Sequence, residues 1–120
     1  MKLAIIGPQN ISVENLEEYI PSGVTEIISG RNNQIGRQAA EYAKAHDLPL
    51  TEIFPNVPKY YPGSSLLSDA QIADLADVGL FFWDGVSRWT RFAIVLFEGR
   101  NKKTLVIHKE SDPTSKEEIF

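Results

Sequence analysis

The chain has 120 residues, 42% of them hydrophobic, which is enough for one domain with a substantial core and too few for two. It has no cysteine, which excludes a disulfide framework, a thiolate nucleophile and a zinc–thiolate site. The net charge of −4 gives no basic footprint for nucleic acid, and no apolar run reaches the about 18 residues of a membrane span. We therefore expect a cytoplasmic protein that binds neither nucleic acid nor membrane.

The first residues predict a strand and a helix. The aliphatic run Lys2–Ile6 ends at a Gly-Pro pair, as a strand does before a turn. Ser12 is placed to cap a helix that extends to Ile20 and stops at Pro21. We expect Val13, Leu16 and Ile20 on the apolar face of this helix, and Glu14, Glu17 and Glu18 on its solvent-exposed face.

A second strand, Val24–Ser29, is followed by the polar loop Gly30–Gln34 and by a helix from about Asn33 to His46. The apolar stripe of that helix is Ile35, Ala39, Tyr42 and Ala43. A glycine between a strand and a helix can admit a phosphate to the backbone, but it is also common in ordinary connections. We expect His46 to be structural. It lies far from His108 without ligand-like spacing, so we expect no metal site.

The middle of the chain predicts a third strand, Leu48–Phe54, and then the irregular segment Pro55–Ser65. Tyr60 and Tyr61 in this segment could wall a pocket, stack on a base or pack as a lid over the core. Ser68 and Gln71 have the spacing of a capping box and predict a third helix that ends near Asp77.

The next segment predicts a buried strand, a tight turn and a helix. The apolar run Val78–Trp83 indicates a strand covered on both faces, and Asp84-Gly85 can form the turn. Ser87 can cap the helix that contains the apolar run Phe92–Phe97. The backbone N–H groups at the start of this helix and the guanidinium of its first turn could bind a small anion. The polar residues could equally serve only to cap the helix.

Thr104–His108 predicts a fifth strand, which completes a domain over residues 1–110; residues 111–120 form a tail with a short helix possible at its end. Strands that alternate with helices predict a single Rossmann-like α/β domain. Its sheet would be doubly wound and mainly parallel, in the order 3-2-1-4-5, with helices on both faces. Such sheets bind ligands at the carboxyl ends of the strands, where the strand order reverses. The predicted crevice lies between the first and fourth strands.

The chain resembles the SLOG superfamily, Rossmann-like domains proposed to bind nucleotide-derived ligands, and in particular its small bacterial YspA-like members. The most specific likeness runs from Ala76-Asp77 through Phe82–Gly85 to Ser87-Arg88 and Thr90, similar to the family's A-D…F-W-D-G-x-S-R-G-T. A second family motif, S-G-G-A-R-G-x-D, aligns without a gap onto Ser29–Gly36. The resemblance implies a Rossmann-like fold and a nucleotide-like ligand.

The departures from the family pattern concern the ligand site. Arg31, Asn33, Gln34 and Gly36 replace a glycine, the arginine, a glycine and the aspartate of the second motif. The changes remove close backbone approach and an anion clamp. Ser68-Asp69 stands in place of the family's arginine-asparagine pair, and Trp89 replaces a glycine, where an indole could narrow the crevice or offer a stacking face.

The leading prediction is a non-catalytic binding module, without a cofactor, for a nucleotide-derived or phosphorylated small molecule. Arg88 would pair with the anion, hydroxyls and backbone N–H groups would bind it, and Asp84 would hold a ribose hydroxyl or an amine. The predicted ligand-binding residues are Gly7, Gln9, Ser29, Gly30, Arg31, Asp84, Gly85, Ser87, Arg88, Trp89 and Thr90.

Two alternatives stay open. The first is N-glycosidic hydrolysis or transfer, as in the related phosphoribohydrolase and deoxyribosyltransferase families. The glutamate expected after Gly-Thr in those enzymes is absent, which leaves Asp84 as the weak catalytic candidate. The second is an assembly module with a vestigial pocket. Because Phe92–Phe97 is apolar around the whole helix, it could be buried against a second copy in a homodimer or higher homo-oligomer through this helix and Trp89, or buried entirely within the monomer.

Overall fold

The computed structural model describes residues 1–8, 11–30, 34–53 and 64–110, with only the backbone of residues 64–67. Its elements are β1 (Lys2–Ile6), the 3-10 turn η1 (Leu16–Tyr19), β2 (Glu26–Ser29), α1 (Gln34–Ala45), β3 (Leu50–Glu52), α2 (Ser64–Leu75), β4 (Val78–Trp83), α3 (Arg88–Gly99) and β5 (Lys103–His108). Among the described residues, none of the helices combines the length and the hydropathy needed to traverse a bilayer.

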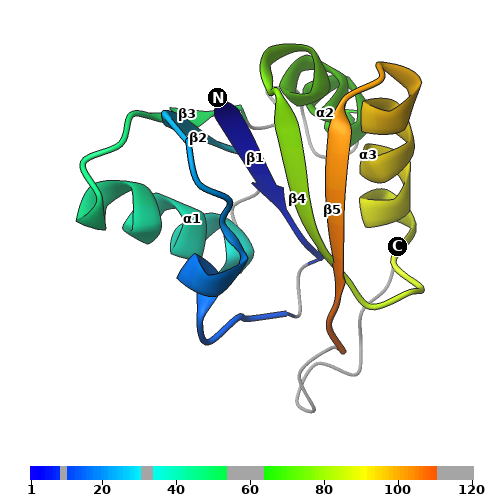
Figure 1. Ribbon diagram of the computed structural model, residues 1–120. Helices are drawn as coiled ribbons and strands as arrows, with labels where there is room; N and C mark the ends of the chain where they lie inside the picture. Colours follow the sequence, from blue (N-terminus) through cyan, green and yellow to red (C-terminus); the bar gives the residue numbers. More distant parts are fainter. Residues whose placement is uncertain (9–10, 31–33, 54–63, 111–120) are drawn as a thin grey trace.

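The strands form one parallel sheet in the order β3-β2-β1-β4-β5, which confirms the predicted fold class and strand order (Figure 1). In the centre of the sheet, Ile5 of β1 lies in register with Ser29 of β2 and Leu80 of β4. The order reverses at β1, because the chain proceeds from β1 to β2 on one side and returns to β4 on the other. The switch point is therefore between β1 and β4.

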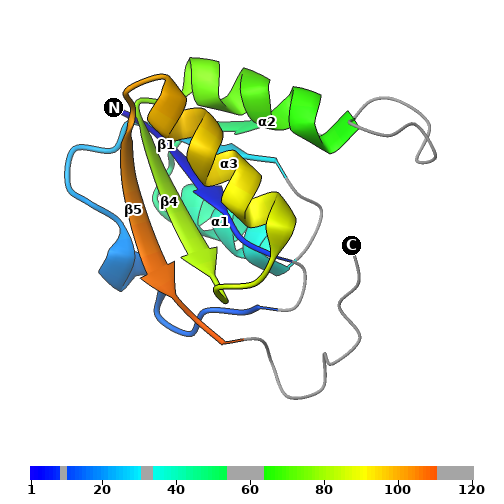
Figure 2. The same ribbon diagram turned by 90° about the vertical axis from the view of Figure 1, so that its right-hand side faces the viewer.

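Each face of the sheet has its own core, since successive side chains of a strand point to opposite faces. Leu3 and Ile5 of β1 pack on the face covered by α1 and η1. Ala4 and Ile6 pack on the face covered by α2 and α3. Figures 1 and 2 show these two helical layers on either side of the sheet. Phe82 extends the first core to η1, where its ring meets that of Tyr19 edge-on with centroids 5.4 Å apart.

The prediction of a helix from Ser12 to Ile20 is wrong, because only the turn η1 forms there. Gln38 of α1 explains this. Its Oε1 accepts the N–H of Val13 at 2.9 Å, and its Nε2 donates to the carbonyl of Val13. The carbonyl of Val13, which would accept an N–H one turn later in a helix, is bound to Gln38 instead, and this disfavours a helix that starts at Ser12. Val13 and Leu16 are nevertheless buried, and the three glutamates of the segment are exposed, as predicted.

The predicted start of the third helix is also wrong. Helix α2 begins at Ser64, so Ser68 lies one turn inside it and is no N-cap. Ser68 and Asp69 are 4% and 1% exposed. They lie one turn before Ile72 and Ala73, on the same buried side of the helix. Ser68 and Asp69 thus extend the buried side of α2 with two polar residues, and a pattern of apolar residues alone could not predict where the helix begins. The second and third strands are also shorter than predicted. The predicted loop with Tyr60 and Tyr61, and the tail after residue 110, lie outside the described residues.

Candidate functional site

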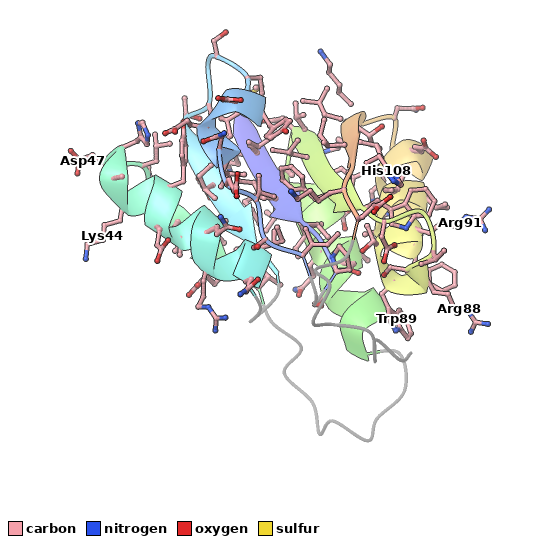
Figure 3. All side chains as sticks on the ribbon, turned by 90° about the horizontal axis from the view of Figure 1, so that it is seen from below. Lys44, Asp47, Arg88, Trp89, Arg91 and His108 are labelled. Carbon is pink, nitrogen blue, oxygen red and sulfur yellow. The ribbon has the colours of Figure 1, made fainter. Side chains whose placement is uncertain are left out.

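The carboxyl ends of the strands meet at one edge of the sheet, and the helices α1 and α3 begin at this edge. Figure 3 views the molecule from this side. Helix α1 starts near the sheet and carries Lys44 towards its far end, with Asp47 just beyond it. Neither α1 nor α3 has an acidic residue in its first turn.

The two glycines at the edge are explained by packing within the chain. A β-carbon at Gly7 would lie 2.8 Å from Cγ1 of Ile35, in the first turn of α1. A β-carbon at Gly30 would lie 2.2 Å from Cδ1 of Ile72, on α2. These distances are too short for carbon atoms, so a side chain at either position would force Ile35 or Ile72 to shift, whether or not a ligand binds. Glycine here is no evidence for a phosphate cradle.

Ser29, the last residue of β2, is the unusual polar group of this edge. Its side chain is fully buried, and its Oγ has no hydrogen-bond partner among the described residues. Ile27 lies in the core beneath α1, so alternation along β2 directs Ser29 to the same face. The hydroxyl is thus buried at the carboxyl edge on the α1 side. A buried hydroxyl without a partner costs about 1–3 kcal/mol, unless water or a ligand binds it.

At the end of β4 the polar groups bind one another. Oδ1 of Asp84 accepts the N–H groups of Val86 and Ser87 at 2.9 and 2.8 Å. Gly85 has φ +88°, a conformation that the turn requires and that glycine adopts without strain. These contacts confirm the predicted tight turn and give Asp84 a structural task at the start of α3.

Ser87 occupies the N-cap position of α3 as predicted, but its side chain makes no capping bond. Its hydroxyl donates to Oγ1 of Thr90 at 3.3 Å, and both residues are only 2% exposed. Its carbonyl accepts the indole Nε1–H of Trp83 at 3.0 Å. This contact was not predicted, because Trp83 was assigned only to the buried strand. Both hydroxyls are therefore engaged inside the protein.

Arg88 and Arg91 project from α3 away from the sheet (Figure 3). Trp89 is 38% exposed, and its ring lies against that of Phe92, with centroids 5.8 Å apart. The structure therefore does not direct the Arg88 side chain towards the switch point between β1 and β4.

Of the other predicted site residues, Gln9 and Arg31 lie outside the described residues. An open hollow of about 200 Å³ lies between η1 and α1, among Glu14, Glu17, Gln38, Glu41, Tyr42 and His46, and includes none of the predicted site residues. Among the residues that the structure describes, no three histidine or acidic side chains are grouped as metal ligands would be.

The predicted site residues thus follow different strands. Gly7, Ser29 and Gly30 lie at the ends of β1 and β2, whereas the residues from Asp84 to Thr90 form the turn and helix start after β4. Comparisons of the chain with protein-family models, with curated proteins and with solved structures found no significant match, so the site rests on its own geometry.

Proposed function

We propose that the carboxyl edge of the sheet binds a nucleotide-derived or phosphorylated small molecule, with the anionic group beside Ser29 and the first turn of α1. The observation that carries the proposal is the fully buried Ser29 hydroxyl, which has no partner among the described residues. A phosphoryl oxygen would accept its hydrogen. The N–H groups of a helix start, which point out of the helix, would contribute further donors.

The β1–β2 part of the edge offers an anion the Ser29 hydroxyl, which has no partner among the described residues, with the exposed Glu52 of β3 in register beside Ser29. The Asp84 carboxylate would repel an anion, and the hydroxyls of Ser87 and Thr90 are bonded to each other. The buried Asp69 belongs to α2, on the opposite face of the sheet from α1. An anion on the α1 side would therefore be shielded from this carboxylate by the sheet.

The resemblance to the SLOG superfamily supports the same ligand class, because Ser29 and Gly30 are the two residues that keep the start of its second motif. We propose binding without catalysis. The acidic residue that the sequence offered as a catalytic candidate, Asp84, holds the turn that starts α3. Glycosidic cleavage stays an untested alternative, which loss of hydrolysis in Asp84→Asn would support.

A thermal-shift screen tests the proposal, with phosphate, nucleoside mono- and diphosphates, nucleotide sugars and ADP-ribose as probes. A probe at about 100 times its dissociation constant adds about 2.7 kcal/mol to the free energy of unfolding, or roughly 10 °C in Tm for a domain of this size. Ser29→Ala should retain or raise the Tm without a probe, because it removes an unpaired buried hydroxyl. It should weaken binding about tenfold or more, since a hydrogen bond to a charged group contributes about 1.5–3 kcal/mol.

Ser87→Ala is the matched control, because it removes a buried serine hydroxyl that has a partner. It should lower the Tm without a probe and keep the probe-induced shift. Arg88→Ala shows whether the start of α3 takes part, and the outward direction of Arg88 predicts an unchanged shift. If no probe raises the Tm, or if Ser29→Ala binds as the unchanged protein does, the proposed site is wrong.

A further inference from the structure

The outer surface of α3 exposes apolar side chains that the monomer does not cover. Phe92 and Val95 are 47% and 51% exposed, and Trp89 and Val86 extend the surface towards the start of the helix. Helix α3 buries Thr90, Ala93, Ile94 and Phe97 on the side that faces the sheet, which leaves Phe92 and Val95 on the opposite side. With ~200 Å² for a complete aromatic side chain, the four residues expose on the order of 300 Å². Apolar patches of this size are often functional.

Gly99 lies on the same outer surface, four residues after Val95. A β-carbon at Gly99 would meet no atom of the chain within 4 Å, and its backbone does not have a positive φ. The helix is terminated by Asn101 at φ 58°, together with the bond from the N–H of Lys102 to the carbonyl of Phe97 at 3.0 Å. Glycine weakens a helix, yet nothing within the described chain requires a glycine at position 99. A second molecule that packed closely against this part of α3 would require the missing side chain.

The charges of α3 oppose its own dipole. Arg88 and Arg91 are exposed in the first turns, where the helix start is already positive, and Glu98 is exposed in the last turn, where the helix end is negative. Among the described residues, these three side chains have no ion-pair partner. An antiparallel second helix with the same sequence would bring Glu98 of one copy to the arginines of the other, whereas a parallel one would oppose like charges.

We propose that two copies of this chain associate through the outer surfaces of α3, packed antiparallel about a two-fold axis that passes between Phe92 and Val95. Phe92 of each copy packs against Val95 of the other. Arg91 and Glu98 lie on the same flank of α3. In an antiparallel pair about a two-fold axis, this flank of one helix faces the same flank of the other, so Arg91 of each copy pairs with Glu98 of the second copy. The missing side chain of Gly99 makes room for the start of the opposite helix. This surface is separate from Ser29, so it does not depend on the proposed function.

Sedimentation velocity on the full chain from about 1 to about 100 µM tests this association. The unchanged protein should progress from 13.4 kDa towards twice that mass. Gly99→Leu should weaken association about tenfold or more while its Tm stays equal or rises, because leucine favours a helix more than glycine does. Glu98→Arg should weaken association similarly, because the new arginine of each copy faces Arg88 and Arg91 of the other.

Charge reversal provides the decisive comparison. The combination Arg88→Glu, Arg91→Glu and Glu98→Arg should associate again, because each copy then offers acidic residues to the arginine of the other. Lys44→Glu, at the far end of α1, is the matched control and should leave the mass unchanged. A protein that stays at 13.4 kDa up to about 100 µM overturns the proposal, as does a dimer that Gly99→Leu and Glu98→Arg leave intact.

Discussion

Gly30→Ala tests whether the glycine after β2 is required by packing or by a ligand. The new β-carbon would lie 2.2 Å from Cδ1 of Ile72 and 3.4 Å from the carbonyl oxygen of Ile53. Ile72 is fully buried, so its end has little room to move. Overpacking of this kind costs about 1–3 kcal/mol, offset by about 0.4–1 kcal/mol because alanine restricts the unfolded chain. The Tm should fall, by up to roughly 10 °C, in a calorimetric or circular-dichroism melt.

Ile72→Val supplies the control, because it removes the atom that the new methyl group would meet. The next atom of Ile72, Cγ1, is 3.6 Å away, an ordinary contact distance. Ile72→Val alone should cost about 0.5–1.5 kcal/mol, and the double variant should be more stable than the sum of the two losses by at least about 1 kcal/mol. Additive losses would refute the packing argument. If the double variant regained its stability but its Tm no longer rose with the probe, the ligand would also require the glycine at position 30.

Three further changes test the local geometry by denaturant unfolding. Asp84→Ala should cost about 0.5–2 kcal/mol, and Asp84→Asn less, because asparagine keeps an acceptor oxygen for the two N–H groups that follow; equal losses would contradict this assignment. Gly85→Ala should cost about 1–3 kcal/mol, because a side chain is strained at φ +88°, and a neutral result would argue against that turn. Gln38→Met should cost about 1–3 kcal/mol, because it leaves both backbone groups of Val13 without their partner; an unchanged midpoint would remove our explanation for the missing first helix.

The strand order was predictable because it follows from patterns that extend along the chain. Val78–Trp83 is apolar throughout and becomes β4, an interior strand between β1 and β5. The regular alternation of strands and helices requires crossovers, and their handedness leaves few possible orders. The turn at Asp84-Gly85 was also predictable, because an aspartate before a glycine satisfies local backbone groups from within the turn.

The errors arose where a distant side chain decides the local structure. Gln38 is 25 residues away from Val13, and no pattern near Ser12 could reveal that its amide would bind the backbone there. Whether a hydroxyl has a partner is equally invisible in the sequence. Ser29 ends a strand, Ser87 follows one, and both precede a helix, yet Ser29 lacks a partner among the described residues and Ser87 has one.

The proposed ligand site and the proposed dimer interface lie on different surfaces of the domain, so different variants can test each of them. Ser29 lies on the face covered by α1, whereas Phe92, Val95 and Gly99 lie on the outer side of α3, beyond the opposite face. The parallel sheet lies between these two surfaces, so the ligand and the second copy would contact no residue in common. Gly99→Leu should therefore weaken association and keep the probe-induced shift in Tm, whereas Ser29→Ala should reduce the probe-induced shift and keep association. If either variant changed both properties, the site and the interface would have to be coupled through the elements that meet at the carboxyl edge, and the ligand would then bind nearer to the start of α3 than the Ser29 hydroxyl indicates.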